Sequence, residues 1–294
     1  MRLFKKSSNS IVQRKNNKMK IVKHSGDIVD FNREKLHQSL LRSGARDVII
    51  DEVLRAIEKE VFEGISTKKI YKLAFRMLKQ ISGAHAARYN LRDAIQQLGP
   101  AGFFFEKFVA RIFLSEGYET ITNLTLQGKC VSHEIDVCIR KNDEVGMVEC
   151  KFHAGHEANS NVKVPMYIFS RFNDLKGKTH RIFTHKDKIE SCRIVTNNRF
   201  TGDAITYATC SGIELLSWDY PAKGNLKQKI DNHSLYPITC LTTLSLAEKE
   251  KLLILNILLV KELLNNSEAL KKIELSENRI KNVLKETAQL SNFL

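Results

Sequence analysis

Residues 133–151 read HEIDVCIRKNDEVGMVECK, and this stretch carries the clearest strand pattern in the central part of the chain. Two apolar runs flank the turn-like segment Arg140–Asp143, which is typical of two strands joined by a tight turn. Pairing the two runs as a hairpin brings Asp136 close to Glu149. Because side chains alternate along a strand, Glu149 and Lys151 point to the same face of the predicted sheet.

The predicted hairpin gathers two carboxylates and one ammonium group in a half-buried patch. Burial of charged groups is costly unless they are paired or bind an ion. A divalent cation held by Asp136 and Glu149 would offset that cost, so the stretch indicates a metal site.

The net charge of the chain is its most unusual bulk property. The 294 residues are enough for about two domains, and the hydrophobic share of 43% and charged share of 27% are those of an ordinary soluble globular protein. The formal net charge is +14. Such a balance predicts a polyanionic partner, with nucleic acid ahead of a membrane surface. The alternative is a basic tail that serves solubility alone.

The cysteine pattern excludes a zinc-binding module of the usual spacing. The six cysteines form no Cys-x-x-Cys pair and no Cys/His cluster. Most lie in apolar runs, so we expect buried free thiols in a reducing compartment. The N-terminus lacks a signal-peptide core, and the longest apolar run, Leu252–Val260, is too short to span a bilayer. These features predict a soluble, cytoplasmic protein without a membrane partner.

Composition shifts divide the chain into four predicted parts. They are a basic flexible arm (1–19), a first domain (20–98), a second domain (99–222) that starts at Gly99-Pro100, and a C-terminal helical module (223–294). The first domain is expected to form a short strand pair followed by helices. The expected helices start at Arg33 after the capping residue Asn32, span Asp51–Phe62, start again after a cap at Ser66 or Thr67, and span Ala86–Leu98.

The first domain resembles the ATP-cone, a small regulatory nucleotide-binding domain. The segments that carry the resemblance are Val22–Gly26, Phe31–Leu36, Gly64–Ile70 and Ala86–Arg92. The resemblance implies binding of ATP or dATP as an allosteric effector. The residues it assigns to the nucleotide are Val22, Lys23, Asn32, Lys35, Thr67 and Arg92. One departure is Asp93, which stands where the family often has a basic residue.

The segment Phe103–Leu114 predicts an amphipathic helix that carries Glu106 among several phenylalanines. Placed inward, this carboxylate would need a partner such as a lysine or a metal-bound water. Placed outward, it would be a first-turn glutamate favoured by the helix dipole. The helix pattern alone leaves both placements open.

The order of elements from this helix onward resembles the restriction-endonuclease-like fold, most closely its Mrr-type catalytic domain. A helix with Glu106 precedes the strands with Asp136 and Glu149, and a helix around 162–175 follows. The later segments Ser191–Asn198, Arg199–Ala204 and Ile213–Trp218 agree with the Mrr pattern, so the resemblance covers about 100–220. It implies an α/β/α core with a mixed sheet.

This resemblance implies metal-dependent cleavage of phosphodiester bonds. Asp136 and Glu149 would hold Mg²⁺ or Mn²⁺, with the backbone carbonyl of Cys150 as a third ligand. Lys151 would position or deprotonate the attacking water, and Glu106 would hold a second metal or orient a water. Glu149 stands where Mrr-like proteins often have glutamine, which adds a metal-binding charge.

Basic residues between 163 and 199 predict a surface that binds the nucleic-acid backbone. This region holds nine Lys/Arg against three acids, with phenylalanines between them. We assign DNA contact to Lys163, Arg171, Lys176 and Arg199. The alternative is an ordinary charged face over core phenylalanines, and both readings are compatible with the sequence.

The C-terminal module, 223–294, is expected to be helical, with an apolar stretch over Leu246–Leu264 and an amphipathic one over Ser276–Leu290. The segment Ile238–Leu264 is similar to a degenerate helix-hairpin-helix. No glycine follows Gly224, whereas such hairpins usually use glycine to approach a phosphate, so packing or oligomerisation is the alternative to DNA contact.

Taken together, the sequence predicts a multi-domain α/β protein: an ATP-cone, a restriction-endonuclease-like core and a C-terminal helical module. The predicted function is that of a metal-dependent DNA endonuclease, regulated by ATP or dATP through a change in homo-oligomeric state, with a role in restriction or antiviral defence. The alternatives are a nucleotide-sensing, DNA-binding transcriptional regulator that does not cleave, and a nuclease acting on RNA or branched DNA.

Overall fold

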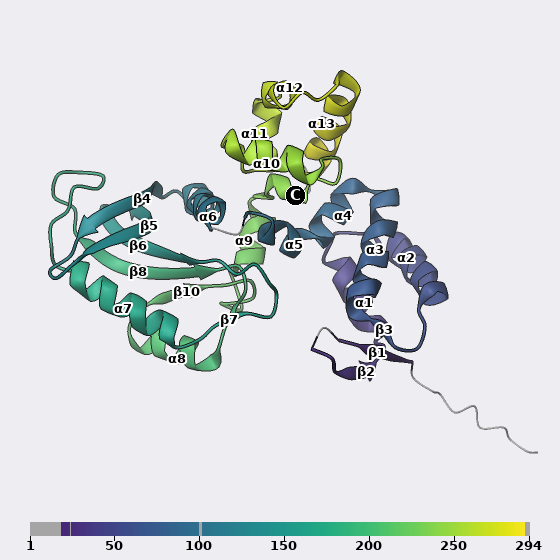
Figure 1. The fold of residues 1–294 in the computed structure, drawn as a ribbon, viewed down its shortest axis with the longest axis horizontal. Coiled ribbons are helices and arrows are strands. Elements are labelled where there is room, and N and C mark those ends of the chain that lie inside the picture. Colours follow the sequence, from purple (N-terminus) through teal and green to yellow (C-terminus); the bar gives the residue numbers. More distant parts are fainter. Residues whose placement is uncertain (1–18, 24, 100–101, 292–294) are drawn as a thin grey trace, which may run out of the picture.

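A computed structural model of the 294-residue chain describes residues 19–23, 25–99 and 102–291. The predicted basic arm, apart from residue 19, lies outside these residues. The described chain contains a helical N-terminal part, a central part built on a five-stranded sheet, and a cluster of C-terminal helices (Figure 1). A mixed α/β fold with a helical C-terminal region is therefore confirmed. Among the described helices, none is long and apolar enough to cross a membrane.

The N-terminal part consists of a small sheet and three helices around their own core. Its elements are β1 Lys20–Val22, β2 Ile28–Asp30, α1 Arg33–Leu41, α2 Asp47–Glu60, β3 Ile65–Ser66 and α3 Thr67–Ile81, with the strands in the order β2-β1-β3. The side chain of Asn32 accepts a hydrogen bond from Lys35 N, and that of Ser66 accepts one from Lys69 N. The predicted caps of α1 and α3 are therefore confirmed. The strand β3 was not predicted, and α2 begins at Asp47 rather than at Asp51.

The predicted single helix Ala86–Leu98 is wrong, because two helices meet at Asn90. They are α4, Gly83–Tyr89, and α5, Leu91–Gln96. The Tyr71 hydroxyl donates hydrogen bonds to Asn90 Oδ1 (2.9 Å) and to the carbonyl of Tyr89 (3.1 Å). The Asn90 side chain makes no capping hydrogen bond to α5 and accepts from the Tyr71 hydroxyl instead. These contacts hold the junction and redirect the chain into α5.

The central sheet is mixed, as predicted. Its strands are β4 Glu119–Gln127, β5 Ser132–Lys141, β6 Glu144–Lys151, β8 Ile189–Thr196 and β10 Glu214–Leu216, in the order β10-β8-β6-β5-β4. The strands β4, β5 and β6 are antiparallel neighbours, and β6, β8 and β10 run parallel. Asn142 and Asp143 have φ of 50° and 64°, which fits the two-residue turn that tight hairpins favour. The predicted hairpin is confirmed.

Helices cover both faces of this sheet (Figure 1). The helix α6, Phe103–Ser115, lies on one face, and α7, Lys163–Leu175, and α8, Gly202–Cys210, lie on the other. The two-stranded ribbon of β7, Asn159–Ser160, and β9, Arg199–Phe200, completes this part. The layers are those of an α/β/α core.

The C-terminal part consists of short helices, of which α13 is the longest. They are α9 Leu226–Asn232, the 3₁₀ turn η1 Ile238–Cys240, α10 Leu246–Ile254, α11 Val260–Asn265, α12 Glu268–Lys272 and α13 Glu277–Ser291. The apolar stretch Leu246–Leu264 is not one helix, because Asn256 adopts a left-handed φ of 61° and turns the chain between α10 and α11.

The C-terminal helices share one hydrophobic core with α4, α5, α6 and one face of the sheet. Glu286 on α13 is buried and accepts hydrogen bonds from Thr242 N (2.8 Å), Thr243 N (2.9 Å) and Thr243 Oγ1 (2.7 Å). A Cβ at Gly83, the first residue of α4, would come within 3.0 Å of Glu286 Oε1. Packing therefore joins α4 and α5 to the parts that follow them, and α4 also contributes Ala86 to the core that α1, α2 and α3 surround.

Candidate active site and nucleotide pocket

The strands β5 and β6 place Asp136 opposite Glu149. Val137 pairs with Val148 in the antiparallel register, so the next residues outward, Asp136 and Glu149, face each other where the hairpin opens. The backbone N–H of Cys150 donates a 2.7 Å hydrogen bond to Asp136 Oδ2, which orients that carboxylate. Lys151, two residues beyond Glu149, ends β6 with an exposed side chain. The structure thus brings together the three residues of the predicted site.

The Asp136 and Glu149 carboxylates are partly buried, and burial is the main reason that their pKa values are raised. Burial and the charge of Asp136 raise the pKa of Glu149 to about 7. Burial also raises the pKa of Asp136, against the opposing effect of the Cys150 N–H. Two neighbouring carboxylates in a site of low polarity favour either protonation or a bound cation.

Glu106 belongs to the same electrostatic group. It lies in the first turn of α6, and Gly102, the capping residue of that helix, lies close to its carboxylate. Burial raises the pKa of Glu106 to about 7, with further increases from the charges of Asp136 and Glu134. Of the two placements that the sequence left open, the structure therefore has Glu106 near the other carboxylates.

Arg171 is the unexpected member of the site. Its Nη1 lies 2.6 Å from Glu149 Oε2, and its Nη2 donates to the carbonyl of Glu134. The sequence placed Arg171 on a DNA-binding surface, where its partner would be a phosphate. Residue spacing along α7 gives the face on which Arg171 lies but not its distance from β6, so sequence reasoning missed the pair with Glu149.

The other residues assigned to DNA are dispersed. Lys163 begins α7, and Lys176 follows its last residue, so they lie at opposite ends of the helix. Arg199 forms an ion pair with Asp219 at 2.6 Å. Contact of these side chains with DNA stays a prediction, as does a metal bond from the Cys150 carbonyl. Within the described residues, no three His, Cys, Asp or Glu side chains are arranged to hold a metal.

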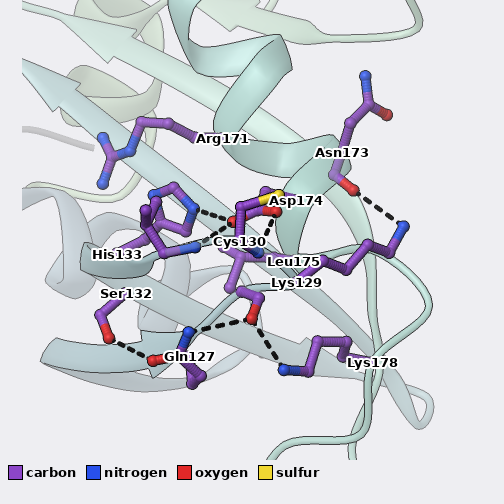
Figure 2. Close-up of polar contacts among 12 residues, drawn as sticks. Gln127, Lys129, Cys130, Ser132, His133, Arg171, Asn173, Asp174, Leu175 and Lys178 are labelled. Carbon is purple, nitrogen blue, oxygen red and sulfur yellow. Dashed lines mark hydrogen bonds and ion pairs between the residues drawn. The ribbon is translucent and has the colours of Figure 1, made fainter.

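Asp174 on α7 ties the turn between β4 and β5 to the helix (Figure 2). It accepts hydrogen bonds from Cys130 N (2.8 Å), Val131 N (3.2 Å) and His133 Nε2 (2.8 Å). The hydrogen bond from His133 is the largest of several effects that lower the pKa of Asp174. His133 therefore packs the hairpin against α7.

The N-terminal part contains a cavity of about 690 Å³. Four of the residues assigned to the nucleotide line it, namely Lys23, Asn32, Lys35 and Thr67. Arg33, Tyr71 and Tyr89 also line this cavity and were missed, since the two tyrosines are not distinguishable in sequence from core residues of their helices. Val22 is adjacent to the lining residues in the chain.

Arg92 lies elsewhere, on α5 between the N-terminal part and the sheet. Its Nη2 is 3.3 Å from Asn198 Oδ1, and its guanidinium carbon is 5.9 Å from the centre of the Trp218 ring. It is not among the residues that line the cavity. The helix break at Asn90 explains this placement, because it turns α5 away from α4.

Comparison with known proteins places these features in a family. Residues 100–220 match a family described as restriction endonuclease, and residues 236–291 match the C-terminal domain of AF1548-like proteins. The restriction-endonuclease domain indicates a nuclease, and domains of this type generally use divalent metals. No ATP-cone match accompanies these two.

Similar proteins show how far the likeness extends along the chain. An uncharacterised protein of Archaeoglobus fulgidus is 38% identical over 133 residues, which are 45% of this chain and 71% of that protein. The crystal structure of AF1548, a protein of unknown function, is 32% identical with a TM-score of 0.53 and covers 64% of this chain and 97% of that one. A second structure, Can2 from Sulfobacillus thermosulfidooxidans with cyclic tetra-adenylate, is 17% identical with a TM-score of 0.33 over 67% of this chain and 54% of that one. On the first two relationships, the chain belongs to the AF1548-like family.

Proposed function

We propose that the chain is a divalent-metal-dependent endonuclease that hydrolyses phosphodiester bonds in DNA. The observation that carries the proposal is the opposed pair of Asp136 and Glu149 on β5 and β6, followed by Lys151 at the end of β6. This arrangement lies within a domain of the restriction-endonuclease family.

The chemistry of the donor set fits Mg²⁺ or Mn²⁺. Both ions prefer oxygen ligands, and the carboxylates of Asp136 and Glu149 supply them from adjacent strands. The raised pKa values mean that the surrounding positive charge does not fully stabilise the ionised form of these carboxylates. A bound cation would provide that stabilisation. When bound, the ion would neutralise charge on the scissile phosphate and lower the pKa of water.

Lys151 and Glu106 would bind the phosphate and transfer the proton of the attacking water. Lys151 is exposed at the end of β6, where its ammonium group can donate hydrogen bonds to a phosphate oxygen or position the attacking water. The pKa of Glu106 is raised to about 7, so this carboxyl group exchanges a proton readily near neutral pH. Its role is to orient the water or accept its proton.

A plasmid-cleavage assay tests this proposal. In Mg²⁺, Asp136→Ala and Lys151→Ala are each expected to lower the cleavage rate by about 100-fold or more. The matched control is Glu144→Ala, which removes an exposed carboxylate at the other end of β6. Wild-type cleavage by the Asp136→Ala variant would overturn the proposal. Metal-dependent DNA binding without cleavage would favour the transcriptional regulator, and a panel of RNA and branched DNA would reveal another substrate.

The N-terminal cavity supports a second part of the proposal, that ATP or dATP binds there as an effector. Its volume of about 690 Å³ is within the range of small-molecule sites. Lys23 and Lys35 supply positive charge for a triphosphate, and Tyr71 and Tyr89 supply aromatic surface for a base.

Calorimetry with ATP and dATP tests this assignment independently of cleavage. Lys35→Ala is expected to weaken binding by about tenfold, because it removes a phosphate-binding charge. Lys72→Ala is the control, since Lys72 is exposed on α3 and does not line the cavity. Equal affinities in all three proteins would contradict it. Light scattering with each nucleotide tests whether binding changes a homo-oligomeric state. The role in restriction or antiviral defence stays a prediction.

A further inference from the structure

The Arg171 side chain contacts three groups: the Glu149 carboxylate, the Glu134 carbonyl and the Tyr167 ring. Nη1 contacts Glu149 Oε2 at 2.6 Å, and Nη2 donates to the Glu134 carbonyl. The guanidinium carbon lies 5.7 Å from the centre of the Tyr167 ring, one helical turn earlier on α7. The Arg171 and Glu149 side chains are only 11% and 17% exposed. This is therefore a directed, largely desolvated ion pair rather than a surface contact.

The ion pair and a metal ion would compete for the same carboxylate. A divalent cation bound by Asp136 and Glu149 would have the positively charged guanidinium as its neighbour. Like charges at such short separation repel strongly where water is largely excluded. Arg171 in its present position therefore weakens metal binding at the site.

A phosphate group can relieve this competition. Guanidinium groups bind phosphate oxygens through paired hydrogen bonds, and a phosphodiester entering the site would bring negative charge to Arg171. The guanidinium would then share its hydrogen bonds with the phosphate, and Glu149 would become available to the metal.

We propose that Arg171 is a positioning residue that makes metal binding and nucleic-acid binding depend on each other. Without nucleic acid, Arg171 occupies Glu149 and keeps the metal affinity low. With nucleic acid, the phosphate takes over Arg171 and the metal affinity rises. This inference rests on the proposed metal site, and it adds the order in which that site is completed.

Mn²⁺ affinity measured with and without a phosphorothioate duplex, which resists hydrolysis, tests the inference. In the wild type the duplex is expected to tighten Mn²⁺ binding by roughly 5- to 150-fold, the usual range of coupling between two ligands. In Arg171→Gln, Mn²⁺ is expected to bind more tightly than in the wild type without duplex, and the duplex should add less than about twofold. A residue with a purely structural role would not raise metal affinity when it is removed.

Two further variants keep the test decisive. Arg171→Lys retains the positive charge, so its metal affinity without duplex should stay low, with part of the coupling preserved. Arg193→Gln breaks another arginine–glutamate pair of the same sheet, with the exposed Glu214, and should leave the coupling unchanged. Thermal melts confirm that each variant is folded.

The possible failures are distinguishable. Mn²⁺ binding that is no tighter in Arg171→Gln than in the wild type, with coupling intact, would overturn the inference and leave the proposed function standing. Absence of Mn²⁺ binding to the wild type, with and without duplex, would overturn the metal site and the inference together.

Discussion

Asp93 Oδ1 lies 2.6 Å from Nε2 of His156, and this contact joins α5 to the segment that follows the strand of Glu149 and Lys151. Gln96 Nε2 contacts the other ring nitrogen of His156 at 2.9 Å. On the opposite side, Asn198 Nδ2 donates to the carbonyls of Gly155 (2.6 Å) and Ala158 (2.8 Å). Residues 152–158 are therefore held between the N-terminal helices and the end of β8.

His156→Ala is expected to loosen this segment without unfolding the chain. Removal of two side-chain hydrogen bonds should cost about 1–2 kcal/mol of unfolding free energy, and amide hydrogens of 152–158 should exchange faster. Mass spectrometry of hydrogen exchange measures the change, with His185→Ala as the control, since His185 is exposed in another loop. Unchanged exchange in 152–158 would show that the Asp93 contact does not restrain the segment.

Asp174→Ala is expected to detach the turn between β4 and β5 from α7. Two backbone N–H groups and the His133 ring lose their acceptor (Figure 2). We expect a lower melting temperature and faster exchange in 128–133. The neighbouring control is Asn173→Ala, because the Asn173 side chain is exposed. Equal melting temperatures for the two variants would contradict the inference that Asp174 ties this turn to α7.

Asp174 also predicts how the stability of the fold changes at acidic pH. The hydrogen bond from His133 is the first cause that lowers the pKa of Asp174 in the folded protein. A lowered pKa stabilises the fold above the unfolded value of about 4, and this contribution is lost as the pH falls further. Acid unfolding monitored by circular dichroism should show wild type and Asp174→Ala converging at low pH.

The carboxylates of the candidate site predict the opposite pH effect for metal-free protein. Burial and the charge of Asp136 raise the pKa of Glu149 to about 7, and burial raises that of Glu106 to about 7. The folded state then binds protons more tightly than the unfolded state. The contribution of these two groups to the free energy of unfolding is therefore greatest below about pH 4.3, and it is lost as the pH rises to about 7. The shift of Glu149 spans more than two pKa units, and one unit is about 1.4 kcal/mol, so we expect a loss on the order of 3 kcal/mol from this group.

Chemical denaturation in EDTA at about pH 5 and about pH 7.5 measures this loss. Glu149→Gln should reduce the difference between the two pH values, whereas Glu190→Gln, at an exposed position of β8, should not. Mg²⁺ should stabilise the wild type more at the higher pH, where the carboxylates are ionised. Equal stabilisation by Mg²⁺ at both pH values would contradict binding through Asp136 and Glu149.

Local patterns were sufficient to predict the centre of this site. The alternation of the two apolar runs and the Asn142-Asp143 turn determine the register of β5 and β6, and the register places Asp136 opposite Glu149. The position of Glu106 followed only from the packing of α6 against the sheet, because an amphipathic helix alone does not fix which polar residues face a neighbouring element.

Contacts between distant segments account for what the sequence did not reveal. The helix break at Asn90 depends on the Tyr71 hydroxyl from another helix, and the pair of Arg171 with Glu149 depends on where α7 crosses the sheet. Asn256 could have signalled the break between α10 and α11, since asparagine tolerates a left-handed φ better than most residues. The surrounding leucines and isoleucines obscured that signal.

Glu286→Ala is expected to separate the C-terminal helices from the rest of the chain. Glu286 is 4% exposed, and its loss would leave the N–H groups of Thr242 and Thr243 and the Thr243 hydroxyl without their acceptor. Leaving such buried donors without an acceptor costs roughly 1–3 kcal/mol. Glu286→Gln keeps the shape and one acceptor oxygen, so its cost should be smaller.

Urea unfolding and hydrogen exchange of α13 and α4 measure the two changes. The matched control is Gln289→Ala, which shortens an exposed side chain on the same helix and should be close to neutral. Because α13 shares its core with α4, α5 and α6, loss of Glu286 should also speed exchange in α4. An effect confined to α13 would mean that the C-terminal helices stabilise themselves and that their contact with α4 contributes little.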